Sequence, residues 1–145
     1  MAQPRNHRQI TVVNIHHKNR FRYNVYIGRS RAGQPRNPLQ NDYRIGEDGD
    51  RIDVICKFIA DFRHKWENDP QFKQAVLDLH GPLGCFCAPK PCHGDVYRIF
   101  LESYAISEEA AFNAIERYAE ELKASRDAKP EPDPPEPDPQ LSMDF

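Results

Sequence analysis

Two short segments near the N-terminus are rich in β-branched and aromatic residues and are bounded by polar runs. They are residues 10–15, with the sequence ITVVNI, and residues 23–27, with the sequence YNVYI. Segments of this length and composition are typical of β-strands. Gly28 and Arg29 end the second strand, and a polar loop with several glycines and prolines follows over residues 30–49. Because loops of this length in a small domain are often functional, we expect this loop to contribute to a site.

The hydrophobic pattern then changes to the spacing of a helix. Asp50 is a candidate N-cap, and the apolar residues after it recur at intervals of three and four. They are Ile52, Ile55, Ile59, Phe62 and Trp66. Asp69-Pro70 is a typical start for a second helix.

The C-terminal half predicts one more strand and two more helices. The strand is expected at residues 83–87, one helix begins at about Gly94, and Ser107 caps the last helix. The order of elements predicts a small single-domain α/β fold, with a mixed sheet of three or four strands and about four helices.

Residues 23–27 and 83–87 become parallel neighbours if the intervening helices form the crossover between them. Their carboxyl ends then meet at one edge of the sheet, where ligands bind in open α/β folds. The sequence therefore predicts a crevice that Gly28 and Arg29 share with the segment 85–93.

Composition divides the 145 residues into a domain, residues 1–126, and a Pro- and acid-rich tail, residues 127–145, which we expect to be disordered. No apolar run approaches the length of a transmembrane helix, and residues 1–9 lack the apolar region of a signal peptide. We therefore expect a cytoplasmic protein with no membrane partner.

Charge is segregated along the chain although the net charge is only −2. Residues 1–41 carry eight Lys or Arg and no Asp or Glu, whereas residues 127–145 carry six acids and one Lys. This asymmetry favours an anionic partner such as a nucleotide or nucleic acid. Two alternatives remain open: the arginines form a solvated face, or the acidic tail folds back over them.

Three cysteines and a histidine lie within nine residues, at Cys85, Cys87, Cys92 and His93. Four such ligands suit a tetrahedral metal ion, and Zn²⁺ fits them best. A second interpretation is a reactive Cys92 thiol at a helix start, with His93 or Asp95 assisting proton transfer. A third is that these are small buried residues near a tight turn.

At these residues the chain resembles a family of small bacterial and phage domains of unknown function. The matching segments are residues 25–29 (VYIGR), 37–43, 51–66 and 85–95 (CFCAPKPCHGD), within residues 10–105. The loop departs from the family pattern, because Gln40, Asp42 and Tyr43 stand where Gly, Pro and Phe are usual, while Asn41 is kept. The resemblance implies a shared site and no particular reaction.

The last six residues form a further motif, in which Gln140, Leu141, Met143 and Phe145 follow a run of prolines and acids. They resemble the hexameric motif that binds the bacterial sliding clamp, with Met143 where Leu is usual. The Pro-rich run is expected to be extended and to hold the peptide away from the domain. A generic acidic tail is the alternative.

Together these patterns predict a nucleotide- or nucleic-acid-binding accessory module. Arg29, Gly28 and Asn41 are expected to contact the ligand, the Cys/His cluster to hold zinc, and the tail to recruit the protein to DNA replication or repair. The alternative is a small enzyme that acts on a nucleotide, nucleoside or nucleic-acid end, using metal-bound water or Cys92, with His93 and Asp95 assisting. A third possibility is an adaptor that binds only proteins.

Overall fold

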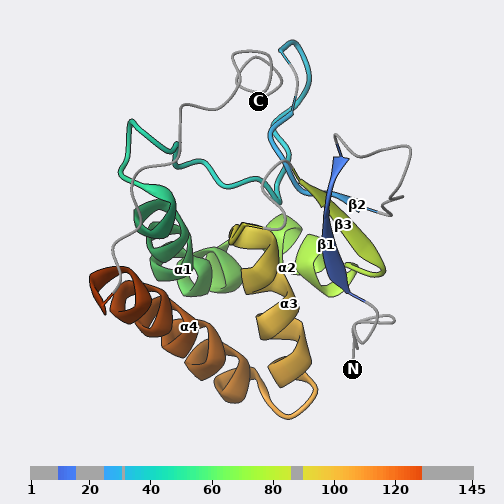
Figure 1. Ribbon diagram of the computed structural model, residues 1–145. Helices are drawn as coiled ribbons and strands as arrows, with labels where there is room; N and C mark the ends of the chain where they lie inside the picture. The colour runs from blue at the N-terminus through green and yellow to red at the C-terminus, as the bar shows by residue number, and fades with distance from the viewer. Residues whose placement is uncertain (1–9, 16–24, 31, 86–89, 129–145) are drawn as a thin grey trace.

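The computed structural model describes residues 10–15, 25–30, 32–85 and 90–128. Within them a small sheet packs against four helices, which confirms the expected α/β class (Figure 1). The strands are β1 (Thr11–Asn14), β2 (Val25–Tyr26) and β3 (Pro82–Cys85), and the helices are α1 (Arg51–Asn68), α2 (Pro70–Leu77), α3 (His93–Tyr104) and α4 (Glu108–Ala128).

β3 lies at the centre of the sheet, between β1 and β2. It pairs with both neighbours in parallel, so that Val13 lies opposite Gly84 and Val25 lies opposite Leu83. The parallel pairing of β2 with β3 confirms the prediction that the helices form a crossover. Within the described residues the sheet is all parallel and not mixed, because β1 also runs in this direction on the other side of β3.

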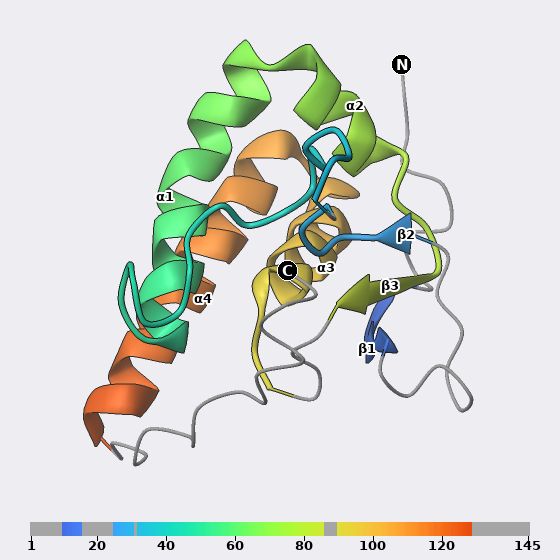
Figure 2. The same cartoon turned by 90° about the horizontal axis from the view of Figure 1, so that it is seen from above.

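The helices gather on one side of the sheet, as two perpendicular views show (Figures 1 and 2). α3 follows β3 and contacts β1, and α4 turns back along α3 and also packs against α1. The chain between β2 and α1 runs as an irregular segment past the ends of the strands before it enters α1 (Figure 2). This arrangement brings the loop, the strand ends and the start of α3 to one region.

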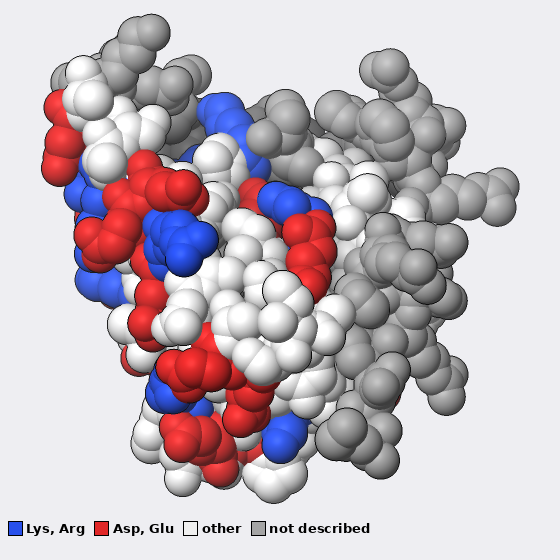
Figure 3. Space-filling model, turned by 90° about the horizontal axis from the view of Figure 1, so that it is seen from below, with Lys and Arg blue, Asp and Glu red and all other residues white. Residues whose placement is uncertain are grey.

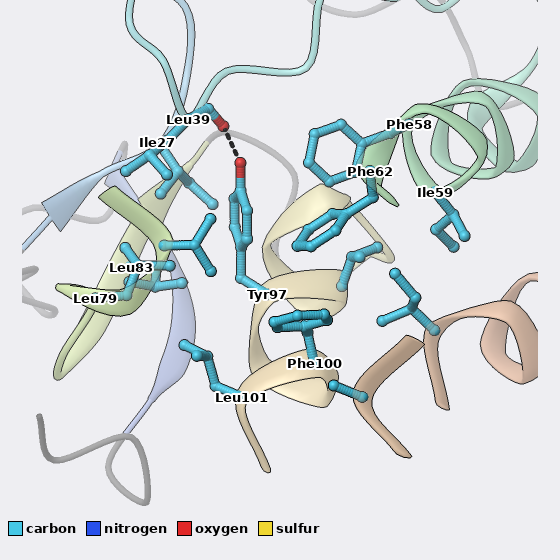
Figure 4. Packing of buried hydrophobic residues seen from close by; sticks show 14 of the residues in the cluster. Ile27, Leu39, Phe58, Ile59, Phe62, Leu79, Leu83, Tyr97, Phe100 and Leu101 are labelled. Carbon is cyan, nitrogen blue, oxygen red and sulfur yellow. Dashed lines mark hydrogen bonds between the residues drawn. The ribbon is translucent and has the colours of Figure 1, made fainter. Parts of the chain in front are cut away.

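Tyr97 on α3 lies at the centre of the core and is fully buried. Figure 4 shows its ring between Ile27, which follows β2, and Leu83 of β3 on one side and Phe58 and Phe62 of α1 on the other. The ring centroids of Tyr97 and Phe58 are 5.5 Å apart in an edge-to-face arrangement, which aromatic pairs prefer. The core therefore fixes α3 against both the sheet and α1.

Local sequence signals account for the helix starts. Asp50 and Asp53 form a reciprocal capping box at α1, with N–H···O distances of 2.8 and 2.9 Å. Asp69 caps α2 ahead of Pro70, and the Ser107 hydroxyl accepts from the Ala110 amide at 3.0 Å at the start of α4. All three predicted starts are confirmed.

The buried face of α1 is wider than the predicted stripe. Val54 and Phe58 are buried in addition to Ile55, Ile59, Phe62 and Trp66, whereas Ile52 is only half-buried. The reason is that α1 is covered by the loop and α3 as well as by α4, so a second row of its side chains faces inward.

α4 ends at Ala128, two residues beyond the boundary expected at residue 126. The rest of the tail, including the docking motif at 140–145, lies outside the described residues. Among the helices that the structure describes, none combines the length and apolar character needed to cross a membrane.

Candidate functional site

The carboxyl ends of β2 and β3 meet the N-terminus of α3, as the sequence predicted. The Ile27 amide donates to the Gly84 carbonyl at 3.0 Å, and the Ile27 carbonyl accepts from His93 Nε2 at 2.8 Å. Gly94 follows in the first turn of α3, and a Cβ at this position would lie 2.8 Å from Ile27 Cδ1 and 3.0 Å from Val12. Glycine therefore lets α3 begin directly against the sheet.

Cys92 is the N-cap of α3. Its Sγ accepts from the Gly94 amide at 3.3 Å, and the Asp95 carboxylate accepts from the Cys92 amide at 3.1 Å. This is a capping box in which a thiol takes the place of the usual hydroxyl or carboxylate. Asp95 thus caps the helix.

Cys85, the last residue of β3, brings a second sulfur to this point. Its Sγ lies 3.5 Å from Cys92 Sγ, and the two residues are 1% and 3% exposed. Two thiolates on one tetrahedral zinc ion, with Zn–S bonds of about 2.3 Å, would be about 3.8 Å apart. The two sulfurs are therefore close to the spacing of a shared metal ion.

The third predicted cysteine ligand, Cys87, lies outside the described residues. Among those that are described, no three His, Cys, Asp or Glu side chains are grouped so as to hold a metal ion. A metal site here therefore depends on Cys87, or on a movement of His93.

His93 is buried in the core, where its ring packs edge-on to Phe58 and Tyr97 at centroid distances of 5.4 and 5.8 Å. Since the Ile27 carbonyl can only accept, Nε2 carries the proton and a neutral ring has its lone pair on Nδ1. A backbone carbonyl that fixes one ring nitrogen is the usual support of a metal-binding histidine. The same bond also serves a purely structural histidine.

The loop after β2 is held by its own polar side chains. Asn37 Nδ2 donates to the carbonyls of Tyr26 and Gly28 at 3.0 and 2.8 Å, and its Oδ1 accepts from the Leu39 amide at 3.0 Å. The Leu39 carbonyl in turn accepts from the Tyr97 hydroxyl at 2.8 Å (Figure 4). Asn37 thus ties the loop to β2, and Tyr97 ties it to the core.

Arg29 and Asn41, the predicted ligand contacts, take part in the same framework. Arg29 Nη2 donates to the Tyr43 carbonyl at 2.9 Å and Nε to the Asn41 carbonyl at 3.4 Å. Burial, followed by the nearby Arg44 charge, lowers the pKa of Arg29. Asn41 Nδ2 donates to the Val54 carbonyl at 3.1 Å, and its Oδ1 accepts from the Tyr43 amide at 3.0 Å.

The loop contains an ion pair between Arg36 and Asp42. The Arg36 guanidinium makes two hydrogen bonds to the Asp42 carboxylate. Burial alone would raise the Asp42 pKa, but the hydrogen bonds from Arg36 and Gln40 outweigh it and lower that pKa. Of the eight bases in residues 1–41, only Arg29 and Arg36 fall within the described residues. On the face that Figure 3 shows, acidic side chains are interspersed with basic ones.

Two residues near the edge were not singled out by the sequence. Asn14 ends β1 opposite Cys85, and Arg51 Nη1 donates to the Pro91 carbonyl at 3.2 Å, just before Cys92. The strand order is the signal that would have placed Asn14, because a strand paired with β3 must end beside Cys85. No local pattern could have identified the contact of Arg51.

Comparison with known proteins gives a family and one curated relative. An uncharacterized 12.4 kDa protein in the nrdA-td intergenic region of Enterobacteria phage T4 is 34% identical over 71 residues, which are 44% of this chain and 66% of that protein. The match thus spans just under two thirds of the relative's length. No solved structure matches.

The family model matches residues 13–103, which include the last two residues of β1, the loop, the first two helices and almost all of α3. The match therefore contains the carboxyl edge, the cysteine segment and the loop that frames them. This chain belongs to the family described as a domain of unknown function, DUF4326.

Proposed function

We propose that the domain is a cytoplasmic accessory module that binds a nucleotide or nucleic acid at the carboxyl edge of its sheet. In this proposal Cys85, Cys87, Cys92 and His93 hold a zinc ion beside the ligand, and the C-terminal peptide recruits the module to a bacterial sliding clamp. The proposal has three parts, and each can be tested separately.

The contact between Cys85 Sγ and Cys92 Sγ, at 3.5 Å, is the observation that carries the proposal. It joins the end of the central strand to the start of a helix whose N-terminus carries a partial positive charge. Phosphate groups bind at such helix starts next to parallel strands. A metal ion on these sulfurs would add positive charge at the same edge.

Zinc content tests the metal site. The full chain is purified without a tag, and its metal is measured before and after chelation. We expect one zinc per chain in the wild type and loss of that zinc in Cys85→Ser and Cys92→Ser. Cys56→Ser is the matched control, because Cys56 lies on α1 against the Ala119 carbonyl. A wild type without metal would overturn this part.

Arg29 is the proposed phosphate contact, although two of its N–H groups already donate to the loop carbonyls. A guanidinium has five N–H donors, so the others remain for a ligand. Arg29→Gln should weaken binding of a single-stranded oligonucleotide and reduce its salt dependence by about one phosphate contact. Arg44→Gln removes the same charge from the exposed part of the loop and should change neither. Equal effects of the two variants would contradict a specific contact.

Recruitment rests on Gln140, Leu141, Met143 and Phe145. Binding to a purified bacterial sliding clamp should be lost on deletion of residues 140–145 and strongly reduced by Phe145→Ala. Ser142→Ala is the matched control inside the same peptide, since Ser142 is not one of the four motif positions. Full retention of clamp binding after the deletion would remove this part of the proposal.

An enzyme is the second candidate, favoured by the Gly94 amide that donates to Cys92 Sγ at a helix start. Such a donor stabilises a thiolate, which is the nucleophilic form of cysteine. However, His93 Nε2 and the Asp95 carboxylate already bond to backbone groups. Cys92→Ser distinguishes the candidates: loss of turnover with intact binding and fold favours an enzyme, whereas joint loss of metal and fold favours the binding module.

A further inference from the structure

Cys85 and Cys92 have a second chemical possibility that does not depend on a metal ion. Their sulfurs are in van der Waals contact at 3.5 Å, although one ends β3 and the other begins α3. A disulfide bond is about 2.0 Å long, so the sulfurs need to approach by only about 1.5 Å. Side-chain rotation can provide much of a movement of this size.

We infer that Cys85 and Cys92 form an intramolecular disulfide when the protein meets a low-molecular-weight disulfide oxidant, which makes the carboxyl edge a site of redox modification. The inference rests on the contact of the two sulfurs alone. It therefore stands or falls independently of the zinc and nucleotide proposals, although it concerns the same edge.

The exchange proceeds in two steps that balance. The Cys92 thiolate attacks one sulfur of the oxidant RSSR, forms a mixed disulfide and releases RS⁻. The Cys85 thiolate then attacks Cys92 Sγ, forms the Cys85–Cys92 bond and releases the second RS⁻. The two thiol protons end on the two RS⁻ groups, so one RSSR is reduced to two RSH as the cysteine pair is oxidised.

Cys92 is assigned the first attack because of its place in the fold. Its Sγ accepts a hydrogen bond from the Gly94 amide at the start of a twelve-residue helix, a position typical of attacking cysteines. Cys85 lies at the end of the central strand, and its Sγ is 3.5 Å from Cys92 Sγ, the atom that it attacks in the second step. Cys92 is thus the attacking thiol and Cys85 the resolving one.

Cys56 provides the contrast within the same chain. It is half-buried on α1, its Sγ contacts the Ala119 carbonyl at 3.8 Å, and burial raises the pKa of its thiol. No other described cysteine sulfur is in contact with it. We therefore expect Cys56 to stay reduced under conditions that oxidise the pair.

The consequence of oxidation follows from the position of the two residues. The bond would tie the end of β3 to the start of α3 through a ring formed by residues 85–92. Disulfide sulfurs are also poor metal ligands, because the thiolate is the form that binds. Oxidation and metal binding at these sulfurs would exclude each other.

Differential alkylation of the full chain tests the inference. Protein freed of metal by chelation is equilibrated with mixtures of oxidised and reduced glutathione. It is then unfolded in acid-quenched denaturant, so that buried thiols are exposed, and free thiols are blocked with N-ethylmaleimide. Disulfides are then reduced and labelled with iodoacetamide. Trypsin yields one peptide, residues 74–98, that contains Cys85, Cys87 and Cys92, because the Lys90–Pro91 bond resists cleavage. A second peptide, residues 52–57, contains Cys56. Fragmentation of the first peptide locates the label.

The expected result is iodoacetamide label on Cys85 and Cys92 together, with Cys87 and Cys56 blocked by N-ethylmaleimide. The same pair should form in Cys87→Ser. Label on a pair that contains Cys87, glutathione adducts without an internal disulfide, or thiols that stay reduced in pure oxidised glutathione would each overturn the inference. The wild type alone decides the matter, so the test survives if Cys85→Ala or Cys92→Ala fails to fold.

A parallel sample loaded with zinc separates this inference from the proposed function. Oxidation of the metal-free pair in a protein that never binds zinc leaves the inference intact and removes the metal site. A protein that binds zinc but whose metal-free pair does not oxidise keeps the metal site and overturns the inference. If both hold, zinc should slow the appearance of the disulfide.

Discussion

The loop at residues 37–43 and the start of α3 lie at the same edge, but their polar groups behave differently. In the loop, side chains such as Asn37 and Asn41 bond to backbone groups of β2, α1 and the loop itself. At the start of α3, two sulfurs lie against each other, and a histidine takes a backbone carbonyl on one ring nitrogen. The loop is held by hydrogen bonds to the backbone, whereas the start of α3 brings two cysteine side chains and a histidine together.

This difference divides the segments that carry the family resemblance into two parts. The loop part of the pattern is explained by hydrogen bonds that the folded chain makes with itself. The cysteine segment is only partly explained in this way, since capping a helix does not require a thiol and does not account for the presence of Cys85. Chemistry is therefore better sought at the sulfurs than in the loop.

Asn37→Ala should give the largest change in stability, because it removes three hydrogen bonds from a half-buried side chain. We expect a loss of about 2–3 kcal/mol in the free energy of unfolding, measured in urea. Asn68→Ala, at the exposed end of α1, removes only exposed contacts with His64 and should cost less than about 0.5 kcal/mol. Similar losses in the two variants would contradict the view that the Asn37 hydrogen bonds hold the loop in place against β2.

Gly94→Ala tests the close contact of α3 with the sheet, without touching either sulfur. The added methyl group would lie 2.8 Å from Ile27 Cδ1, which should cost about 1–2 kcal/mol even though alanine favours a helix. Ile27→Val removes that Cδ1 atom. The double variant should therefore lose less free energy of unfolding than the two single variants lose together. Losses that simply add would contradict the close contact between residue 94 and Ile27.

The parts of the fold that the sequence predicts are mostly those set by interactions between residues close together in the chain. The capping residues Asp50, Asp69 and Ser107 act within their own helix turns, so the helix starts follow from short patterns. The parallel pairing of β2 and β3 follows from the long helical crossover. The position of β1 does not, because nothing in residues 10–15 specifies the strand with which they pair.

The candidate site shows the same limit. The spacing of Cys85 and Cys92 predicts that both lie near a strand end and a helix start, and the structure brings their sulfurs together. Arg29 looked like a free anion contact, but its guanidinium donates to carbonyls twelve and fourteen residues away. Hydrogen bonds to distant backbone atoms leave no trace in a local sequence pattern. This is also why the contact of Phe58 with His93 was not foreseen.

Tyr97→Phe removes a hydrogen bond that anchors the loop to the core. The Tyr97 hydroxyl donates to the Leu39 carbonyl at 2.8 Å in a fully buried position, and its loss leaves that carbonyl unsatisfied. We expect a loss of about 1–2 kcal/mol in the free energy of unfolding. Tyr104→Phe, on the same helix but half-buried, is the control and should cost less. Equal losses would mean that the anchor contributes nothing specific.

The smallest expected change in stability concerns the junction between the loop and α1, and it depends on pH. Arg126 in the last turn of α4 donates to Asp50 and Asp53, which form the capping box where the loop enters α1. The hydrogen bond from Arg126 is the largest cause that lowers the pKa of Asp53 below its ordinary value of 3.8. A carboxyl group with a lowered pKa stabilises the fold above its unfolded-state pKa, and this contribution is lost as the pH falls through the folded value.

The pH effect is measured by comparing melting temperatures of the wild type and Arg126→Gln at about pH 7 and about pH 3. The variant should melt lower than the wild type at neutral pH, and the gap should narrow in acid because protonated Asp53 no longer attracts Arg126. The effect should be small, since these groups are partly exposed and screened by solvent. A difference in melting temperature that does not change with pH would mean that Arg126 acts by packing. The charges of Arg126 and the two aspartates would then not hold the start of α1 against α4.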